Sequence, residues 1–312
     1  MGQLKTKHLL GLENIDKEDI KKIIDTGFMF REVLDRPVKK VPSLNGLNIL
    51  NLFFENSTRT KLSFELAEKR LSADVINFSA SSSSLNKGES FKDTVQNIHS
   101  MKVDCIVMRH PTPGSSIHLT DFVDSIVVNA GDGTHEHPTQ ALLDMMSLKE
   151  KFNNLKNLKV CIVGDILHSR VALSNIFGLK KMGAEVMVCG PQHLIPLSIE
   201  NLGVKASTDL EEAIDWADAL NVLRIQRERM GVGLIPSIRE YNEQFGITEE
   251  KLNRLNKEVV IMHPGPMNRN VEIDSRVADG KSAIILDQVL NGVAIRMSVL
   301  YLLLSRSEEE AK

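Results

Sequence analysis

The stretch LNILNLFFENSTRTKLSFELAEKRL, residues 47–71, decides the fold that we expect for the whole chain. Its first part, Leu47–Phe54, is an apolar run typical of a buried strand, and Lys61–Leu71 has the spacing of a helix. We expect Leu62, Leu66, Ala67 and Leu71 to lie on one face of that helix. A strand, a short polar turn and a helix form the unit from which parallel α/β sheets are built.

The turn between this strand and this helix, Ser57-Thr58-Arg59-Thr60, has the residues of an anion site. A helix N-terminus offers free backbone N–H groups and the positive end of a dipole. The three hydroxyl groups add neutral donors, and the guanidinium of Arg59 adds a fork that matches phosphate oxygens. The glycines and the lysine of a P-loop are missing, so this is a different kind of phosphate cradle. A simpler interpretation is that Ser57 or Thr58 only caps the helix and that Arg59 is a surface charge.

Length and charge bound the class of protein. The 312 residues exceed the usual size of one hydrophobic core, so two domains are expected. The net charge of -3 gives no electrostatic reason to expect nucleic acid or an acidic membrane surface as a partner. The late apolar stretch Val289–Leu304 is interrupted by Asn291 and Arg296, so we interpret it as a packed helix rather than a membrane span.

The three cysteines, Cys105, Cys161 and Cys189, lie in apolar, strand-like runs. An odd number without close pairs indicates free, buried thiols in a reducing compartment, and Met1–Leu10 has no signal-peptide pattern, so we expect a cytoplasmic protein. The sequence contains no cluster of cysteines and histidines that would indicate a metal site. Gly164-Asp165 follows a strand, but the other glycines of a dinucleotide fingerprint are absent, so we expect no nicotinamide cofactor.

Strand-like and helical stretches alternate along the chain. The strand-like runs form two sets, residues 47–54, 75–78, 105–108 and 126–129, and then 160–163, 185–189, 219–223 and 259–262. This alternation predicts an α/β fold of two doubly wound parallel-sheet domains joined by helices. We expect one domain over residues 1–150 and the other over 151–286, with the C-terminal helix, about 287–312, returning to the first domain.

Polar residues follow the carboxyl ends of these strands, where open α/β sheets bind their ligands. The segments concerned contain Arg109 and His110, then Asp165 and Arg170, then Arg224, and finally His263-Pro264-Gly265-Pro266. Arginine, histidine and hydroxyl groups outnumber free carboxylates there, which indicates an anionic ligand.

After the fourth strand, His137-Pro138-Thr139-Gln140 opens a helix with proline in its first turn. His137 and Gln140 are three residues apart, so they lie on one face, and both can donate a hydrogen bond to a carbonyl or an amide. The alternative is that His137 only caps the helix or packs locally. We interpret the serine-rich stretch Ser81–Glu89 as a mobile loop, and we expect Lys87 to be either solvated or part of a lid that carries an ammonium group to an anion.

Several of these motifs resemble one enzyme family. Ser57-Thr58-Arg59-Thr60 and His137-Pro138-Thr139-Gln140 are similar to two signatures that all carbamoyltransferases share. Three further segments resemble those of the aspartate carbamoyltransferase catalytic subunits: Lys87-Gly88-Glu89, Arg224-Ile225-Gln226-Arg227-Glu228-Arg229 and His263-Pro264-Gly265-Pro266. The His-Cys-Leu-Pro and Ser-Met-Gly strings of the ornithine enzymes do not occur. The resemblance covers essentially the whole chain.

The resemblance implies transfer of the carbamoyl group of carbamoyl phosphate to L-aspartate, in pyrimidine (UMP) biosynthesis and without a cofactor. It implies that the phosphate is held by Ser57, Thr58, Arg59 and Thr60. It implies that the carbamoyl group is surrounded by Thr60, Arg109, His137, Gln140 and the backbone carbonyls of Gly265 and Pro266. It implies that aspartate is bound by Lys87, Arg170, Arg224 and Gln226. His137 then serves as a hydrogen-bond donor and need not be a general base.

In this family Lys87 and a nearby serine, here Ser83 or Ser84, reach the active site of a neighbouring subunit. The resemblance therefore implies a homotrimer with shared active sites, and it leaves open whether regulatory chains or a dihydroorotase partner bind. Two other functions remain open. One is a carbamoyltransferase with another amine acceptor, although two arginines and a lysine would repel cationic ornithine. The other is a non-catalytic, anion-binding assembly subunit.

Overall fold

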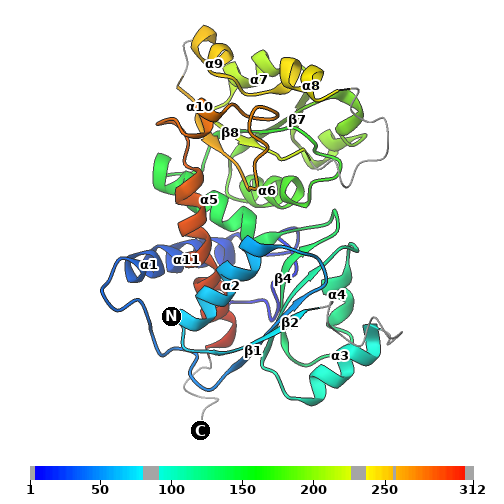
Figure 1. The fold of residues 1–312 in the computed structure, drawn as a ribbon, viewed down its shortest axis with the longest axis vertical. Coiled ribbons are helices and arrows are strands. Elements are labelled where there is room, and N and C mark those ends of the chain that lie inside the picture. The colour runs from blue at the N-terminus through cyan, green and yellow to red at the C-terminus, as the bar shows by residue number, and fades with distance from the viewer. Residues whose placement is uncertain (1–3, 80–90, 226–236, 256–257, 306–312) are drawn as a thin grey trace. The chain divides into compact units, whose positions relative to one another are not determined.

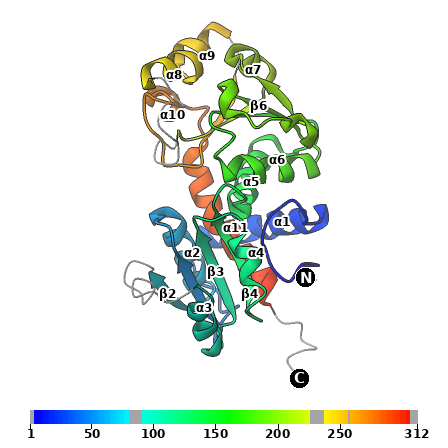
Figure 2. The same ribbon diagram turned by 90° about the vertical axis from the view of Figure 1, so that its right-hand side faces the viewer.

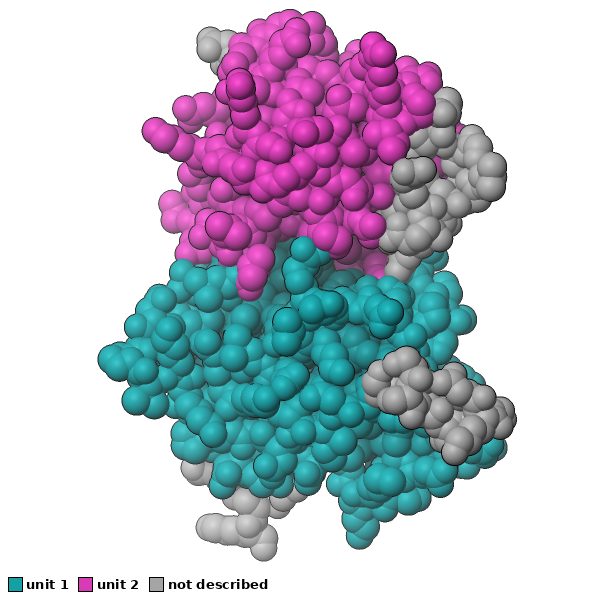
Figure 3. Space-filling model, in the orientation of Figure 1, with its two compact units in different colours: residues 1–146, 290–312 teal, residues 147–289 magenta. Residues whose placement is uncertain are grey.

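The computed structural model describes residues 4–79, 91–225, 237–255 and 258–305. The chain forms two compact units, coloured separately in Figure 3. Unit 1 comprises residues 1–146 and 290–312, and unit 2 comprises residues 147–289. Unit 1 is therefore built from both ends of the chain, whereas unit 2 is one continuous segment.

Unit 1 contains a parallel sheet with the strand order β2-β1-β3-β4 (Figure 1). Its strands are β1 (Asn48–Phe53), β2 (Asp74–Ser79), β3 (Cys105–His110) and β4 (Ile126–Asp132). Alternate residues of β1 and β3, such as Leu52, Ile106 and Met108, share one hydrophobic cluster. Because β1 and β3 are neighbours, their register places Phe53 beside Arg109 at the carboxyl ends of the strands.

The helices of unit 1 follow its strands as expected for an α/β fold. They are α1 (Lys17–Leu34), α2 (Thr58–Arg70), α3 (Phe91–Ser100), α4 (Ser115–Leu119) and the first part of α5 (Pro138–Phe152). The last helix, α11 (Ile285–Leu304), begins in unit 2 and continues into unit 1, where the Ser298 hydroxyl donates to the Ile23 carbonyl on α1 at 2.7 Å. The return of the C-terminal helix to the first domain is thus observed as a direct contact.

Unit 2 contains a second parallel sheet, of order β7-β6-β5-β8-β9. Figure 2 labels its strand β6 and the helices α6 and α7. Its strands are β5 (Lys159–Val163), β6 (Glu185–Cys189), β7 (Lys205–Ser207), β8 (Ala219–Val222) and β9 (Val260–Met262). Its helices are α6 (Arg170–Lys181), α7 (Leu210–Trp216), α8 (Ile238–Phe245), α9 (Glu249–Leu255) and α10 (Ser275–Ala278), with single 3₁₀ turns at Gln192–Leu194 and Ile199–Leu202. The predicted α/β class with two parallel sheets is confirmed.

One expectation about a helix was wrong, and one strand was not predicted. Leu62 and Leu66 do not belong to the buried face of α2, because their side chains are 59% and 40% exposed. Phe64 and Glu68 are fully buried instead, together with Ala67 and Leu71. The short strand β7 was not predicted, because three residues at the edge of a sheet carry too little apolar pattern.

The apolar C-terminal helix and the cysteines behave as parts of a packed interior. By length and composition alone, Ile285–Leu304 could cross a membrane, but 72% of its most apolar window is buried in the protein, as in a core helix. The cysteines Cys105, Cys161 and Cys189 are buried and free. Burial raises the pKa of each of their thiols, so these side chains stay protonated.

Candidate functional site

The turn that joins β1 to α2 presents hydroxyl groups at a helix N-terminus. Ser57 occupies the N-cap position, but its side chain makes no capping hydrogen bond. Its hydroxyl instead donates to Thr60 Oγ1 at 2.9 Å, while Thr58 and Arg59 are exposed. Ser57 is therefore not the ordinary side-chain cap that the simpler interpretation required. This arrangement leaves a row of polar groups at the positive end of the α2 dipole.

Arg109, at the end of β3, is a buried cation aimed by two acceptors. Its Nη2 donates to Glu55 Oε1 at 2.7 Å, and its Nη1 donates to the Ala130 carbonyl on β4 at 3.1 Å. Only 9% of the residue is exposed. Because one acceptor precedes α2 and the other lies on β4, Arg109 joins the ends of three neighbouring strands. Glu55 was not predicted to take part, although it is the acidic residue nearest the hydroxyl-rich turn.

His137 and Gln140 are brought to the same edge of the sheet by the start of α5. His137 is buried, and its carbonyl accepts from the Gln140 backbone N–H at 3.0 Å. The Gln140 side chain donates from Nε2 to Asp144 Oδ1 at 2.9 Å, one turn further along the helix. The oxygen and the nitrogen of a side-chain amide are hard to tell apart, and this hydrogen bond assigns the nitrogen of Gln140 to the side that faces Asp144.

Two buried carboxylates hold the turn that carries His137. Asp132 accepts from the backbone N–H of Gly114 at 2.9 Å and from Asn129 Nδ2 at 2.7 Å, and it contacts His135 Nδ1 at 3.1 Å. This hydrogen bond to Asp132 raises the pKa of His135. Glu136, the residue before His137, accepts from the backbone N–H of Leu12 at 2.8 Å. Both carboxylates thus shape the backbone next to His137 and were not predicted from the sequence.

In unit 2, candidate residues follow β5 and β8, which are adjacent strands. Arg170 is buried at the first position of α6, behind the N-cap Ser169, whose side chain accepts from a backbone N–H. Asp165 is buried and accepts from both the backbone and the Nδ1 of His168, at 3.1 and 3.0 Å. Arg224 is half-buried and follows β8 after one residue, Leu223. The two arginines thus follow neighbouring strands in the chain, and their role as ligands stays a prediction.

The turn after β9 carries Gly265 and Pro266, which are joined by a cis peptide bond. The Gly265 N–H donates to His263 Nδ1 at 2.8 Å, and His263 Nε2 lies 3.2 Å from Glu272 Oε1. His263 and Glu272 are fully buried side chains. The turn is therefore held by a side-chain network of unit 2, in which the predicted residue Gly265 is partly exposed and Pro266 is exposed.

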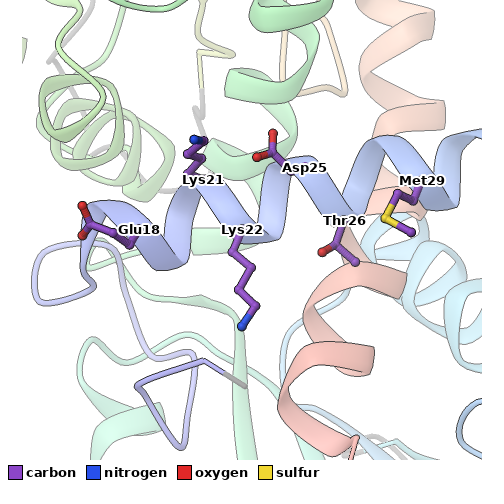
Figure 4. Close-up of a pocket in the computed structure, with 6 residues that line it drawn as sticks. All are labelled: Glu18, Lys21, Lys22, Asp25, Thr26 and Met29. Carbon is purple, nitrogen blue, oxygen red and sulfur yellow. The ribbon is translucent and has the colours of Figure 1, made fainter. Parts of the chain in front are cut away.

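The remaining predicted site residues, Lys87, Gln226 and the serines Ser83 and Ser84, lie outside the described residues. Among the residues that are described, no cluster of acidic, histidine and cysteine side chains could hold a metal ion. A pocket of about 250 Å³ runs along α1 in unit 1 and contains none of the predicted site residues (Figure 4). It is lined by Glu18, Lys21, Lys22, Asp25, Thr26 and Met29, whose charges balance, so it is not a candidate for an anion site.

Two models of known protein domains match the two halves of the chain. Residues 7–150 match the family model "Aspartate/ornithine carbamoyltransferase, carbamoyl-P binding domain", and residues 156–303 match "Aspartate/ornithine carbamoyltransferase, Asp/Orn binding domain". The chain belongs to the aspartate/ornithine carbamoyltransferase family.

Curated relatives and solved structures give the same result. The chain is 61% identical over 308 residues to a protein of Christiangramia forsetii named aspartate carbamoyltransferase catalytic subunit, covering 99% of each chain. It is 61% identical to the protein of the same name from Cytophaga hutchinsonii, covering 97% of this chain and 99% of the other. Its fold is similar to aspartate transcarbamoylase from Trypanosoma cruzi in complex with carbamoyl phosphate, with a TM-score of 0.86, 28% identity and 96% of each chain covered. It is also similar to the M. jannaschii catalytic subunit, with a TM-score of 0.83, 34% identity, and coverage of 96% and 98%.

For a carbamoyltransferase-family chain, the two edges offer complementary chemistry. The edge of unit 1 combines helix N–H groups, hydroxyl groups and arginines, a set that suits a phosphate and a polarised carbonyl. The edge of unit 2 combines Arg170 and Arg224, and each guanidinium can bind one carboxylate in a bidentate way. Buried acidic residues of both units, such as Asp132, Glu136 and Asp165, accept hydrogen bonds from the protein itself and so hold the backbone of these edges.

Proposed function

We propose that this chain is the catalytic subunit of an aspartate carbamoyltransferase, which converts carbamoyl phosphate and L-aspartate to N-carbamoyl-L-aspartate and phosphate. One observation carries the proposal: Arg109 is buried and donates both to Glu55, just before the hydroxyl-rich α2 N-terminus, and to the Ala130 carbonyl on β4, the strand that precedes the turn of His137. The proposal is supported by 61% identity over nearly the whole chain to subunits that carry this name. In the cell, the reaction would belong to pyrimidine (UMP) biosynthesis.

In unit 1, the phosphate would be bound by the α2 N-terminus with Ser57, Thr58, Arg59 and Thr60. The carbamoyl oxygen would accept hydrogen bonds from Thr60, Arg109 and His137. As the amine attacks, negative charge grows on that oxygen, and one such preorganised donor is worth about 3 kcal/mol. Gln140 would bind the carbamoyl amide, and its orientation is already fixed by Asp144.

In unit 2, Arg170 and Arg224 would bind the two carboxylates of aspartate, with Gln226 and Lys87 in support. The carbonyls of Gly265 and Pro266 would accept from the carbamoyl NH₂ group. The amine of aspartate attacks the carbamoyl carbon, the bond from that carbon to the phosphate oxygen breaks, and the amine proton leaves with the phosphate. Holding both reactants in line can itself lower the barrier by about 7 kcal/mol or more.

The test is an assay of phosphate release with carbamoyl phosphate and either L-aspartate or L-ornithine. We expect turnover with aspartate alone, because a cationic acceptor is repelled by Arg170 and Arg224. Arg109→Met should lower kcat by about 100-fold or more, because it removes a donor to the developing oxyanion. Arg239→Met, which removes an exposed arginine of α8, is the control and should leave kcat unchanged. Turnover with ornithine instead would favour another acceptor, and turnover with neither would favour the non-catalytic subunit.

We also propose that the chain acts as a cytoplasmic homotrimer in which Lys87 serves a neighbouring active site. Leu62 and Leu66 of α2 and Ile76 of β2 are 59%, 40% and 44% exposed. Because β2 is an edge strand and leads toward the segment that contains Lys87, these apolar side chains support a subunit contact there. Regulatory chains or a dihydroorotase partner would be additional partners, and neither is needed for the chemistry.

A further inference from the structure

Glu272 is a buried carboxylate of unit 2 that the proposed chemistry does not use. Its side chain is fully buried between β9 and α10. Within the part of the chain that the structure describes, no lysine or arginine forms an ion pair with it. A buried carboxylate without a cation is unfavourable unless several donors satisfy it. The position of those donors therefore indicates what the carboxylate holds in place.

Among the residues that the structure describes, the hydrogen bonds of the Glu272 side chain lead to the turn after β9. Its Oε1 accepts from the Asn268 backbone N–H at 2.5 Å and lies 3.2 Å from His263 Nε2, and its Oε2 accepts from Asn268 Nδ2 at 3.2 Å. Because His263 Nδ1 accepts from the Gly265 N–H, the imidazole proton belongs on Nε2, where it is donated to Glu272. The carboxylate thus fixes both the beginning and the end of the turn that carries Gly265 and Pro266.

The same network reaches the end of the neighbouring strand. Asn268 Nδ2 also donates to the Ile225 carbonyl at 3.2 Å, and Ile225 directly follows Arg224. Strands β8 and β9 are adjacent and parallel, so their carboxyl ends lie side by side. One carboxylate therefore holds two backbone segments, one with the carbonyls of Gly265 and Pro266 and one with the guanidinium of Arg224.

We infer that Glu272 is a positioning residue for the transferase reaction, which fixes the spacing between the Gly265–Pro266 carbonyls and Arg224. This inference rests on the proposed function, in which the first group holds the carbamoyl amide and the second holds a carboxylate of the acceptor. Glu272 touches neither ligand and acts through His263 and Asn268. A correct spacing places the acceptor amine in line with the carbamoyl carbon, and a misplacement of about 1 Å can cost about 100-fold in rate.

The test is the Glu272→Gln variant. Glutamine has the same volume, but its NH₂ group must face either Asn268 Nδ2 or the pair of donors on the other side, so one hydrogen bond becomes a donor–donor contact. We expect a higher KM for aspartate, a lower kcat, and a loss in kcat/KM on the order of 10- to 100-fold. Inhibition by succinate, which has the two carboxylates without the amine, should weaken together with the KM for aspartate. Binding of inorganic phosphate, whose proposed ligands are in unit 1, should keep its wild-type Kd in calorimetry.

Two further variants make the test decisive. Glu249→Gln removes an exposed glutamate of the same unit, paired with Arg276 at 3.1 Å and outside the network, and should match the wild type. Asn268→Ala removes only the bridge, at a partly exposed position, and should raise the KM for aspartate even if Glu272→Gln does not fold. A merely structural role would lower the folded fraction and leave the KM of the folded enzyme unchanged. The inference is overturned if folded Glu272→Gln has the KM and kcat of the wild type, or if Asn268→Ala has them where Glu272→Gln does not fold. If the wild type itself does not turn over aspartate, the proposed function is overturned instead.

Discussion

Arg109 shows how far single residues can be interpreted from sequence. A lone arginine at the end of a buried strand is a reasonable candidate for an anion ligand, and the structure places Arg109 at the carboxyl end of β3, beside Phe53 of β1. Its partner Glu55 could not be assigned, because their 2.7 Å contact depends on the register of β1 against β3. The same holds for Asp132 and Glu136, whose hydrogen-bond donors come from distant parts of the chain. The sequence therefore predicts candidate ligand residues such as Arg109, whereas the partners that orient their side chains depend on the fold.

Glu68 is a residue whose protonation depends on the fold. It is fully buried on α2, and its Oε2 accepts from Asn51 Nδ2 at 2.8 Å. Glu68 Oε1 and Asn51 Oδ1 have no hydrogen-bond partner among the described residues. Burial raises the pKa of Glu68 to about 8, so the carboxyl group is mostly protonated in the folded protein at neutral pH.

This pKa predicts a decrease in stability as pH rises. Between the ordinary pKa of about 4.5 and the folded value of about 8, the folded protein binds a proton that the unfolded chain releases. The contribution of Glu68 is therefore fully present below the ordinary pKa and is lost as pH rises through the folded one, by at most about 1.4 kcal/mol per pH unit. Glu68→Gln mimics the protonated form and should flatten the decline in urea-unfolding free energy between pH 5 and pH 9.

The matched control for this prediction is Glu65→Gln on the same helix. A hydrogen bond from Lys69 lowers the pKa of Glu65, so this group is ionised throughout the window and should leave the slope unchanged. A Glu68→Gln variant with the same slope as the wild type would show that Glu68 does not change its protonation on folding.

At the scale of elements, α2 explains where pattern analysis fails. Two apolar pairs fit its sequence, one with Leu62 and Leu66 and one with Phe64 and Ala67. The structure buries the second pair together with Glu68, whose carboxyl group accepts a hydrogen bond from Asn51. A helix that buries a glutamate cannot be oriented from hydrophobicity alone. The strands other than the short edge strand β7, in contrast, were found within a few residues, since buried parallel strands are continuous apolar runs.

Helix α11 contains a glycine in its interior whose role is to leave room. A Cβ atom on Gly292 would lie 2.7 Å from Arg296 Nη1 and 3.1 Å from Leu143 Cδ2. That guanidinium is buried, donates from Nη1 to the Gly292 carbonyl and to Ser63 Oγ at 2.9 Å each, and lies 5.0 Å from the Phe64 ring centroid. Because Gly292 has no side chain, the Arg296 side chain can lie across the surface of α11 and reach Ser63 on α2.

We expect Gly292→Ala to destabilise the protein by about 1–3 kcal/mol, as overpacking does, despite the better helix propensity of alanine. The measurement is the free energy of unfolding in urea. In an Arg296→Ala background the closest contact is gone, so the same substitution should cost much less or stabilise. Equal effects in both backgrounds would show that Arg296 does not restrict position 292.

At the scale of the whole molecule, the α/β class and its parallel sheets followed from the alternation of elements. We expected domain limits after residues 150 and 286, whereas the two compact units of the structure meet after Met146 and Val289. Both limits fall inside helices, α5 and α11, and a continuous helical pattern has no linker composition that would mark a domain limit.

The assembly can be tested by mixing two inactive variants. If Lys87 serves a neighbouring subunit, Lys87→Ala and Arg59→Ala damage different sites of a mixed trimer. Some sites then receive both native residues, so activity should reappear after subunit exchange, in proportion to the fraction of such sites. Mixed trimers without any recovered activity, detected by mass spectrometry of the intact assembly, would show that the two residues act within one chain.

The construction of unit 1 from both chain ends has a consequence for synthesis. The surface of α1 that receives Ser298 and Ile295 is complete early, but the helix that covers it is made only after the whole of unit 2. At about 5–20 residues per second, translation of unit 2 leaves that surface uncovered for on the order of ten seconds. Unit 2 is continuous and can finish folding in that interval. We therefore expect the segment made second to be the first to reach its native state in the cell.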